Sequence, residues 1–302
     1  MGLDISQKQL NILVTGATGF LGKRLVSTLI KENYKVKVLL RENRKMPFSH
    51  KNLECFDCNL HNTMHLKEAC KNSDIIIHLA AVVNAKNKEE YIKVNVSGTI
   101  NLINCANINP PMQFIFISSV NVLNGNNYYA LSKKEAEREV INSGLNYTIL
   151  RPTMLYGPGD NKNIGYIVDF AQKWHFIPVF GNGEYKLQPL FIDDLVKAIV
   201  LLINETKSFN KVYNLGGADI LSFNQMINLI KQTLNIKMRI IPLPLGIFLF
   251  FGKLGILPQR FFQRFIDLPV DKISDNNFLK DFDLEPVSFL EGLKNLTRNT
   301  LF

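Results

Sequence analysis

The sequence predicts an α/β fold with a doubly wound parallel sheet and a smaller C-terminal lobe. Short apolar runs rich in Val and Ile alternate with helix-length amphipathic segments through the first half of the 302 residues. Such continuous apolar runs are typical of strands buried on both faces, as in parallel sheets covered by helices. A glycine-rich turn joins the first run to the first helical segment, as in nucleotide-binding sheets. Together these observations indicate a Rossmann fold.

The first half of the chain carries the alternating elements. Strands are expected at 11–15, 35–40, 53–56, 75–79, 114–117 and 147–150, and helices at 20–32, 63–71, 89–106 and 130–143. Doubly wound sheets bind ligands beyond the carboxyl ends of their strands. Site residues are therefore expected directly after the strands.

The pattern loosens after Pro152. Loops rich in Gly, Pro and Asn separate two helical patterns, the loops at 157–165 and 181–184 and the helices near 167–174 and 193–204. We expect an NAD(P)-binding domain over residues 1–160. A substrate-binding lobe over residues 161–302 would follow, with some of its elements returning to the sheet.

The charge distribution and the cysteine spacing argue against nucleic-acid binding and against a metal site. The net charge of +9 is spread along the chain without a basic tract, which does not favour nucleic-acid binding. It suits an enzyme whose cofactor and substrate are anions. The four cysteines are scattered, and no second Cys or His pair completes the C-x-x-C spacing of Cys55 and Cys58. We therefore expect reduced thiols, no metal site and a cytoplasmic location.

A strongly apolar segment covers residues 240–251. It is too short to span a bilayer, and Pro242 and Pro244 interrupt it. Arg260 and Arg264 follow among phenylalanines, so contact with a membrane surface is one interpretation. A core or lid segment over the substrate pocket is the interpretation that we prefer.

The turn at residues 15–22 carries the first functional signal. It follows a strand and opens a helix, which is the context that a dinucleotide-binding turn requires. Gly16 permits the tight turn, Gly19 lets the backbone approach a pyrophosphate, and Gly22 lets the helix pack on the strand. The anion would meet free N–H groups at the positive end of the helix dipole.

Arg41 follows the second strand, where the residue that contacts the adenosine ribose is expected. A carboxylate there favours the 2′-hydroxyl of NAD, whereas an arginine attracts a 2′-phosphate. Arg41 therefore favours NADP over NAD. Glu42 is close enough to take the opposite role, so NAD stays open.

Tyr129 and Lys133 are the catalytic candidates. They lie one turn apart on a predicted helix, so both face the same side. A neighbouring ammonium group lowers a tyrosine pKa and lets the phenol exchange a proton near neutral pH. Ser119, at the end of the fifth strand, places a hydroxyl where it can polarise the same oxygen.

These motifs together resemble the short-chain dehydrogenase/reductase superfamily. The resemblance is to its extended branch, the NAD-dependent epimerase/dehydratase family of sugar-nucleotide enzymes. It covers nearly the whole chain, through residues 15–22, 77–81, 94–99, 116–119, 129–133, 150–159, 188–194 and 213–217.

The resemblance implies a role for each matching residue. Tyr129 would be the general acid/base, Lys133 would lower its pKa and bind the nicotinamide ribose, and Ser119 would hydrogen-bond the reacting oxygen. The cofactor would also contact Gly16, Thr18, Gly19, Phe20, Leu21, Gly22, Arg41, Asn59, Leu60, Leu79, Ala80, Ala81, Asn95, Pro152 and Thr153. The substrate would contact Val83, Asn121, Tyr156, Lys186 and Gln188.

Two departures from the family pattern leave the reaction open. Asn59 stands where the family often has an acidic residue toward adenine, and the loop 120–125 lacks the tyrosine of many epimerases. We expect hydride transfer on a nucleotide-diphosphate sugar, and an exchangeable NADP favours a 4-keto-sugar reductase.

Alternatives are an NAD-dependent 4-epimerase, a reductase of a hydrophobic alcohol or ketone, and a non-catalytic dinucleotide-binding subunit. Retention of the Tyr129–Lys133 pair argues against the last. A homodimer is also open.

Overall fold

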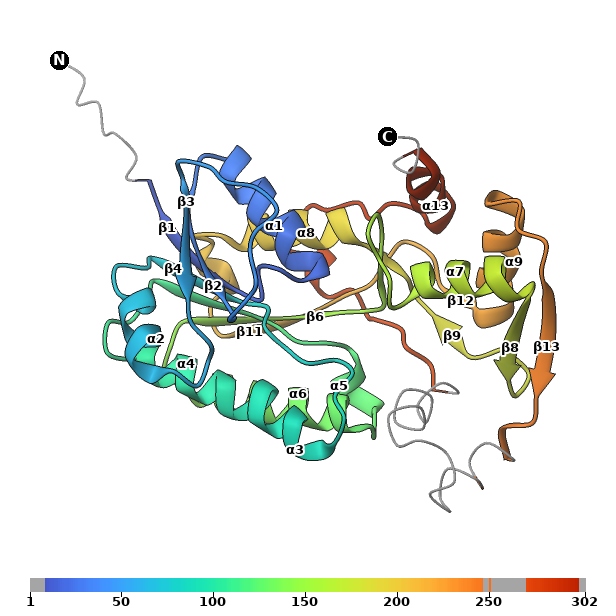
Figure 1. Ribbon diagram of the computed structural model, residues 1–302, viewed down its shortest axis with the longest axis horizontal. Coiled ribbons are helices and arrows are strands. Elements are labelled where there is room, and N and C mark those ends of the chain that lie inside the picture. Colours follow the sequence, from blue (N-terminus) through green and yellow to red (C-terminus); the bar gives the residue numbers. More distant parts are fainter. Residues whose placement is uncertain (1–8, 247–249, 251–269, 299–302) are drawn as a thin grey trace.

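A computed structural model describes residues 9–246, 250 and 270–298. Its centre is a seven-stranded sheet in the order β11-β6-β5-β4-β1-β2-β3 (Figure 1). Every pairing in it is parallel, which confirms the predicted doubly wound fold. The strands are β1 Asn11–Thr15, β2 Lys35–Leu40, β3 Leu53–Asp57, β4 Ile75–His78, β5 Gln113–Ile117, β6 Tyr147–Pro152 and β11 Lys211–Leu215.

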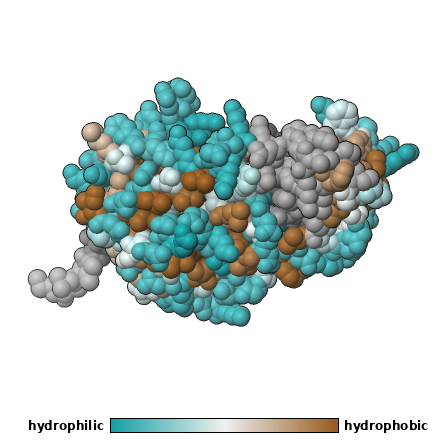
Figure 2. Space-filling view, turned by 90° about the horizontal axis from the view of Figure 1, so that it is seen from below, coloured by the Kyte–Doolittle hydropathy of each residue, from teal (hydrophilic) through white to brown (hydrophobic). Residues whose placement is uncertain are grey.

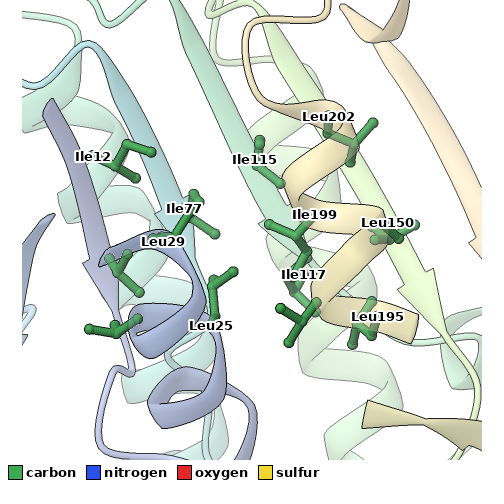
Figure 3. Close-up of a cluster of buried hydrophobic side chains, with 14 of the residues drawn as sticks. Ile12, Leu25, Leu29, Ile77, Ile115, Ile117, Leu150, Leu195, Ile199 and Leu202 are labelled. Carbon is green, nitrogen blue, oxygen red and sulfur yellow. The ribbon is translucent and has the colours of Figure 1, made fainter. Parts of the chain in front are cut away.

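Helices cover both faces of this sheet. Alternate residues of a strand point to opposite sides, so Ile12 and Val14 join one hydrophobic cluster and Leu13 joins another. The helices on the first face are α1 Phe20–Lys31, α8 Ile192–Leu202 and α12 Phe278–Asp281; those on the second are α2 Thr63–Cys70, α4 Gly98–Ala106 and α6 Tyr128–Ile141. Figure 3 shows Leu25 from α1 and Leu195 from α8 among the strand residues of the first cluster.

One predicted helix contains an irregular turn. The segment expected as a helix over 89–106 consists of α3 Lys88–Tyr91, a π-helical turn η1 Ile92–Ser97, and α4. A π turn adds a residue to the helical repeat, and such turns are frequent at functional sites. Apolar periodicity does not reveal it, because the helix continues on both sides.

A second lobe follows the sheet in sequence. It has its own hydrophobic cluster, which includes Tyr156, Ile227 and Leu293. Its elements are β7 Leu155–Tyr156, α7 Ile164–Trp174, β8 Phe176–Phe180, β9 Lys186–Leu187, β10 Leu190–Phe191, β12 Leu221–Ser222, α9 Phe223–Thr233, β13 Arg239–Leu243 and α13 Phe289–Arg298. The later chain also returns to the large sheet, because β11 pairs with β6.

The surface is mixed in character. Figure 2, which views the molecule from below relative to Figure 1, shows hydrophobic side chains interspersed with hydrophilic ones. Among the described residues, we find no helix that is both long and apolar enough to cross a membrane. Residues 247–249 and 251–269, including Arg260 and Arg264, lie outside the described part of the chain. In the described part of the apolar segment, Ile240, Ile241, Leu243 and Phe250 are exposed, so this part is not core as one interpretation expected. The lid and the membrane contact stay predictions.

Candidate functional site

The glycine-rich turn joins β1 to α1 and leaves no space for larger residues. Gly16 has φ +71°, and a Cβ there would lie 2.8 Å from the Ala80 nitrogen. A Cβ on Gly22 would lie 2.2 Å from the Gly16 carbonyl oxygen. α1 begins at Phe20, and neither a side-chain cap nor an acidic residue occupies its first turn. Its free N–H groups therefore fit the pyrophosphate of a dinucleotide.

A pocket lies at the carboxyl end of β2. Its lining residues are Arg41, Glu42, Arg44 and Asn59. Arg41 and Asn59, both expected at the cofactor site, thus come together although a strand separates them in the sequence. Two guanidinium groups and one carboxylate give the pocket a net positive charge, which suits a phosphate. Leu60 is buried next to Asn59 and packs against Gly98.

The segment after β4 passes directly over the glycine-rich turn. The Ala80 N–H donates to the Thr15 hydroxyl at 3.2 Å, and Leu79 and Ala81 on either side are half-buried. Val82 is held at both backbone atoms by the Asn95 amide, at 2.8 and 3.1 Å. Val83 is exposed, so the chain reaches the surface within three residues of Ala80.

Ser119 and Tyr129 meet at the carboxyl end of β5. Ser119 follows this strand, and Tyr129 lies in the first turn of α6, whose N-terminus is capped by the Asn127 side chain. A hydrogen bond from Ser119 lowers the pKa of the Tyr129 phenol, but burial outweighs it and raises this pKa to about 12. Lys133 is not among the groups that shift this pKa, so the expected lowering by Lys133 is not found, and Tyr129 is protonated at neutral pH in this state.

Lys133 lies one helical turn after Tyr129 and is almost fully buried. Its ammonium group donates to the Ile117 carbonyl at 2.7 Å and lies 3.9 Å from the centre of the Phe116 ring. Burial lowers the pKa of Lys133 to about 7, while the carboxylate of Glu137 acts to raise it. Glu137 is itself paired with Arg151 of β6, with the Arg151 Nε 2.9 Å from Oε1.

Thr153 and Gln188 pack together behind the site. The Thr153 hydroxyl donates to the Gln188 carbonyl, and the neighbouring Pro152 is the last residue of β6. The Gln188 amide is 3% exposed and is fully used inside the protein. It donates to the Gly217 carbonyl and accepts from the Ser274 N–H, both at 2.8 Å. In this structure Gln188 therefore joins the loop that contains Gly217 to the segment that contains Ser274.

Tyr156 belongs to the hydrophobic cluster of the second lobe. It is fully buried in the second lobe, with its ring 5.4 Å from that of Phe191 and 5.1 Å from that of Phe289. A Cβ added to Gly292 would lie only 2.0 Å from the phenol oxygen of Tyr156. Tyr156 is therefore enclosed by packing in this structure and is not open to a substrate, contrary to expectation.

A small pocket lies beside Ser119. It is lined by residues 120, 121 and 123–125 of the loop after β5 and by residues 270–273. Asn121 belongs to this pocket, and its N–H donates to the Ser119 hydroxyl at 3.2 Å. Lys186 supports the opposite wall, since its backbone contacts Asp271 at 2.7 Å and Lys272 at 2.8 Å.

Sequence reasoning did not single out Asp271 and Lys272 for this pocket. They carry no local motif, and the bridge between Leu187 and Lys272 and the hydrogen bonds to Lys186 hold them beside β9. The cysteines, in contrast, are free thiols as expected, and burial raises the pKa of Cys58 to about 11 and that of Cys70 to about 12. Within the described ranges, no cluster of His, Cys, Asp and Glu could hold a metal ion.

Comparison with known proteins finds similarity over most of the chain. The family model described as "NAD dependent epimerase/dehydratase family" matches residues 12–216. A UDP-glucose 4-epimerase of Vibrio cholerae is 30% identical over 274 residues, which cover 81% of this chain and 82% of that protein.

Further similarities include a reductase and a solved structure. A ceramide reductase of Caulobacter vibrioides is 28% identical over 191 residues, which cover 63% of this chain and 59% of that protein. The crystal structure of a UDP-glucose 4-epimerase from Thermotoga maritima with UDP-glucose superposes with a TM-score of 0.79. It covers 97% of this chain and 100% of that chain at 24% identity, a likeness of fold.

Proposed function

This chain belongs to the NAD-dependent epimerase/dehydratase family, and we propose that it is a 4-epimerase of a nucleotide-diphosphate sugar. The observation that carries the proposal is the hydrogen-bonded pair of Ser119 and Tyr129, with Lys133 one turn further along α6. This group and the glycine-rich turn both follow strands of one parallel sheet, so they lie along the same edge.

Each residue of this group has a distinct task. Bound NAD supplies reversible hydride acceptance at its nicotinamide ring. The Tyr129 phenolate would accept the proton of the sugar hydroxyl as the hydride leaves the sugar, and the resulting phenol would return that proton when the hydride comes back. The Ser119 hydroxyl would hold the same sugar oxygen. The positive charge of Lys133 stabilises the phenolate that forms when Tyr129 has given up its proton. Pro152 and Thr153 stand at the end of the adjacent strand, where they would bound the nicotinamide.

The Ser119–Tyr129 pair supports hydride transfer in general, and the choice of an epimerase over the reductase that we expected from the sequence rests on the relatives. The Vibrio cholerae relative is named a UDP-glucose 4-epimerase and aligns along most of both chains. A 4-keto-sugar reductase that uses NADPH is our second candidate, and the pocket with Arg41 and Arg44 favours it. A guanidinium pair at the adenosine ribose suits a cofactor with a 2′-phosphate.

We propose that the sugar lies next to Ser119 and Tyr129, at the mouth of the pocket beside Ser119, which at about 20 Å³ is too small in this structure to enclose it. Asn121, Asn124, Asp271 and Lys272 supply amide, carboxylate and ammonium groups there, which is the chemistry that hydroxyls and phosphates require. Residues 1–160 would then hold the cofactor and residues 161–302 would complete the sugar site. A homodimer and a cytoplasmic location remain predictions.

Nuclear magnetic resonance spectroscopy of the sugar anomeric protons tests the proposal. The protein is incubated with UDP-glucose or UDP-N-acetylglucosamine and a small amount of NAD. Appearance of the 4-epimer without net NADH formation is the expected result. If neither sugar is epimerised, while a UDP-4-keto-sugar is reduced with one NADPH consumed per product, the reductase replaces the epimerase.

A further inference from the structure

Buried polar side chains from two central strands and the neighbouring helices form a connected group. Thr15 ends β1, His78 ends β4, Thr99 lies in α4, and Asn95 lies in the π-helical turn η1. All four are at most 2% exposed. Burying polar groups is costly unless each is hydrogen-bonded, so their contacts need explanation.

The side chains form one continuous hydrogen-bonded path. The Ala80 N–H donates to the Thr15 hydroxyl at 3.2 Å, and that oxygen lies 2.6 Å from Nδ1 of His78. Nε2 of His78 lies 2.9 Å from the Thr99 hydroxyl, which donates to the Asn95 carbonyl at 2.7 Å. The path thus runs from residues 79–81, which are expected to contact the cofactor and form the cofactor-lining segment, to the π turn η1.

The direction of each bond follows from the number of available protons. The Thr99 hydroxyl has one proton, which it gives to Asn95, so it accepts from His78 Nε2–H. A neutral imidazole then has only an acceptor at Nδ1, which takes the proton of the Thr15 hydroxyl. The imidazole is neutral because burial, and secondarily the charge of Lys133, lower the pKa of His78 to about 3.

The path continues from Asn95 to the catalytic helix. The Asn95 amide holds the backbone of Val82 and donates to the Ser132 hydroxyl at 2.9 Å. Ser132 in turn donates to the Tyr129 carbonyl at 2.9 Å. The first turn of α6 is therefore connected to Thr15, the last residue of β1, through Ser132, Asn95, Thr99 and His78.

We propose that His78, in its neutral Nε2–H form, is a positioning residue. It fixes the position of the π turn relative to the cofactor-lining segment and, through Asn95, the position of the Tyr129 end of α6. This assignment rests on the proposed role of Tyr129. A satisfied buried network has one low-energy arrangement, which makes it rigid. A shift of about 1 Å at the reacting groups can cost about 100-fold in rate.

Histidine spectroscopy tests the tautomer without reference to activity. The chain has five histidines, and the other four, His50, His61, His65 and His175, are exposed. In ¹⁵N-histidine-labelled protein, His78 should show protonated Nε2 and unprotonated Nδ1 throughout pH 5 to 8. Protonation of Nδ1, or of both nitrogens, in that range would overturn the proposal.

Removal of the Thr99 hydroxyl tests the positioning role. Thr99→Val should lower kcat about 10- to 100-fold with little change in KM for the sugar. Thr99→Ser, which keeps the hydroxyl, should restore most of kcat. Thr148→Val is the matched control, because Thr148 is also fully buried and its hydroxyl donates elsewhere, to the Ser208 carbonyl at 3.0 Å.

The outcomes separate this proposal from the proposed function. If Tyr129→Phe is inactive while Thr99→Val and Thr148→Val turn over equally fast at equal melting temperatures, the positioning role is wrong and the function stands. If Tyr129→Phe remains fully active, the proposed role of Tyr129 is wrong, and the positioning role of His78 falls with it. The ¹⁵N spectra then still establish whether the hydrogen-bonded path exists.

Discussion

The Lys133 ammonium group donates a hydrogen bond of 2.7 Å to the carbonyl oxygen of Ile117, the last residue of β5. Ser119 follows that strand by two residues, so this bond joins the helix of Tyr129 to the strand that delivers Ser119. The buried cation is balanced by the nearby ring of Phe116 and by the carboxylate of Glu137. The stability of this part of the fold therefore depends on the charge of Lys133.

Lys133→Met should reveal that dependence as a function of pH. The pKa of Lys133 is lowered to about 7 in the folded protein from 10.5 in the unfolded chain, so between these values the unfolded chain binds the extra proton. Wild-type stability should consequently rise, relative to the variant, as pH increases from about 7 toward 10.5. Urea unfolding at several pH values measures the difference. Lys134→Met, at an exposed neighbour, is the control, and a pH-independent difference for Lys133→Met would contradict the prediction.

Tyr129→Phe should abolish turnover while NAD binding is retained. Only the phenol oxygen is removed, and general acid/base catalysis contributes roughly 100- to 10,000-fold to a rate. Steady-state assays and calorimetric titration with NAD measure the two properties. Tyr128→Phe, one residue earlier in α6, is the matched control and should keep most of its activity. Equal activities of the two variants would remove Tyr129 from the mechanism.

Gly22→Ala should disrupt the glycine-rich turn. The new Cβ would meet the Gly16 carbonyl oxygen at 2.2 Å, so the backbone must open. Overpacking of this kind costs about 1–3 kcal/mol, and NAD binding should weaken because the N–H groups of α1 are displaced. Gly246→Ala has no neighbour within 4 Å of its Cβ and provides the control. Wild-type NAD affinity and melting temperature in Gly22→Ala would refute the steric argument.

Arg41→Ala should reduce the preference for NADP. Loss of a charged hydrogen bond to the 2′-phosphate should weaken NADP binding about 10-fold or more, with a smaller effect on NAD. Fluorescence titration with both cofactors measures the ratio of the two affinities. Arg138→Ala, at an exposed arginine of α6, controls for the loss of one positive charge. An unchanged ratio of the NADP and NAD affinities would mean that the pocket beside Arg41 does not bind the 2′-phosphate.

Glu137→Gln should destabilise the fold and lower the pKa of Lys133 below its value of about 7. Breaking a buried ion pair costs about 3 kcal/mol, because Arg151 is left without its counter-charge. The double variant Glu137→Gln/Arg151→Gln should recover part of this loss in urea unfolding. Glu135→Gln, at a surface pair with Arg138, should change stability by less than about 1 kcal/mol. Equal effects of the two single variants would contradict the buried-pair argument.

Local pattern was sufficient for most elements of the sheet. The strand predicted at 35–40 is β2 with the same bounds, because its apolar run and its flanking polar residues are both local. β11 Lys211–Leu215 was not predicted as a strand. It becomes one by pairing with β6, more than 50 residues earlier, and only the folded chain brings the two together.

The candidate site likewise contains some residues that local sequence predicts and others that only the folded chain brings together. The sequence by itself determined the glycine-rich turn, the one-turn spacing of Tyr129 and Lys133, and the position of Ser119 after a strand, since each depends on a few neighbouring residues. Only the tertiary structure decided that Gln188 and Tyr156 are enclosed by packing, that residues 270–273 line the pocket beside Ser119, and that His78 joins Thr15 to Thr99. Those relationships join segments from 21 to about 150 residues apart, so burial and hydrogen bonding across the fold define them and no local spacing encodes them.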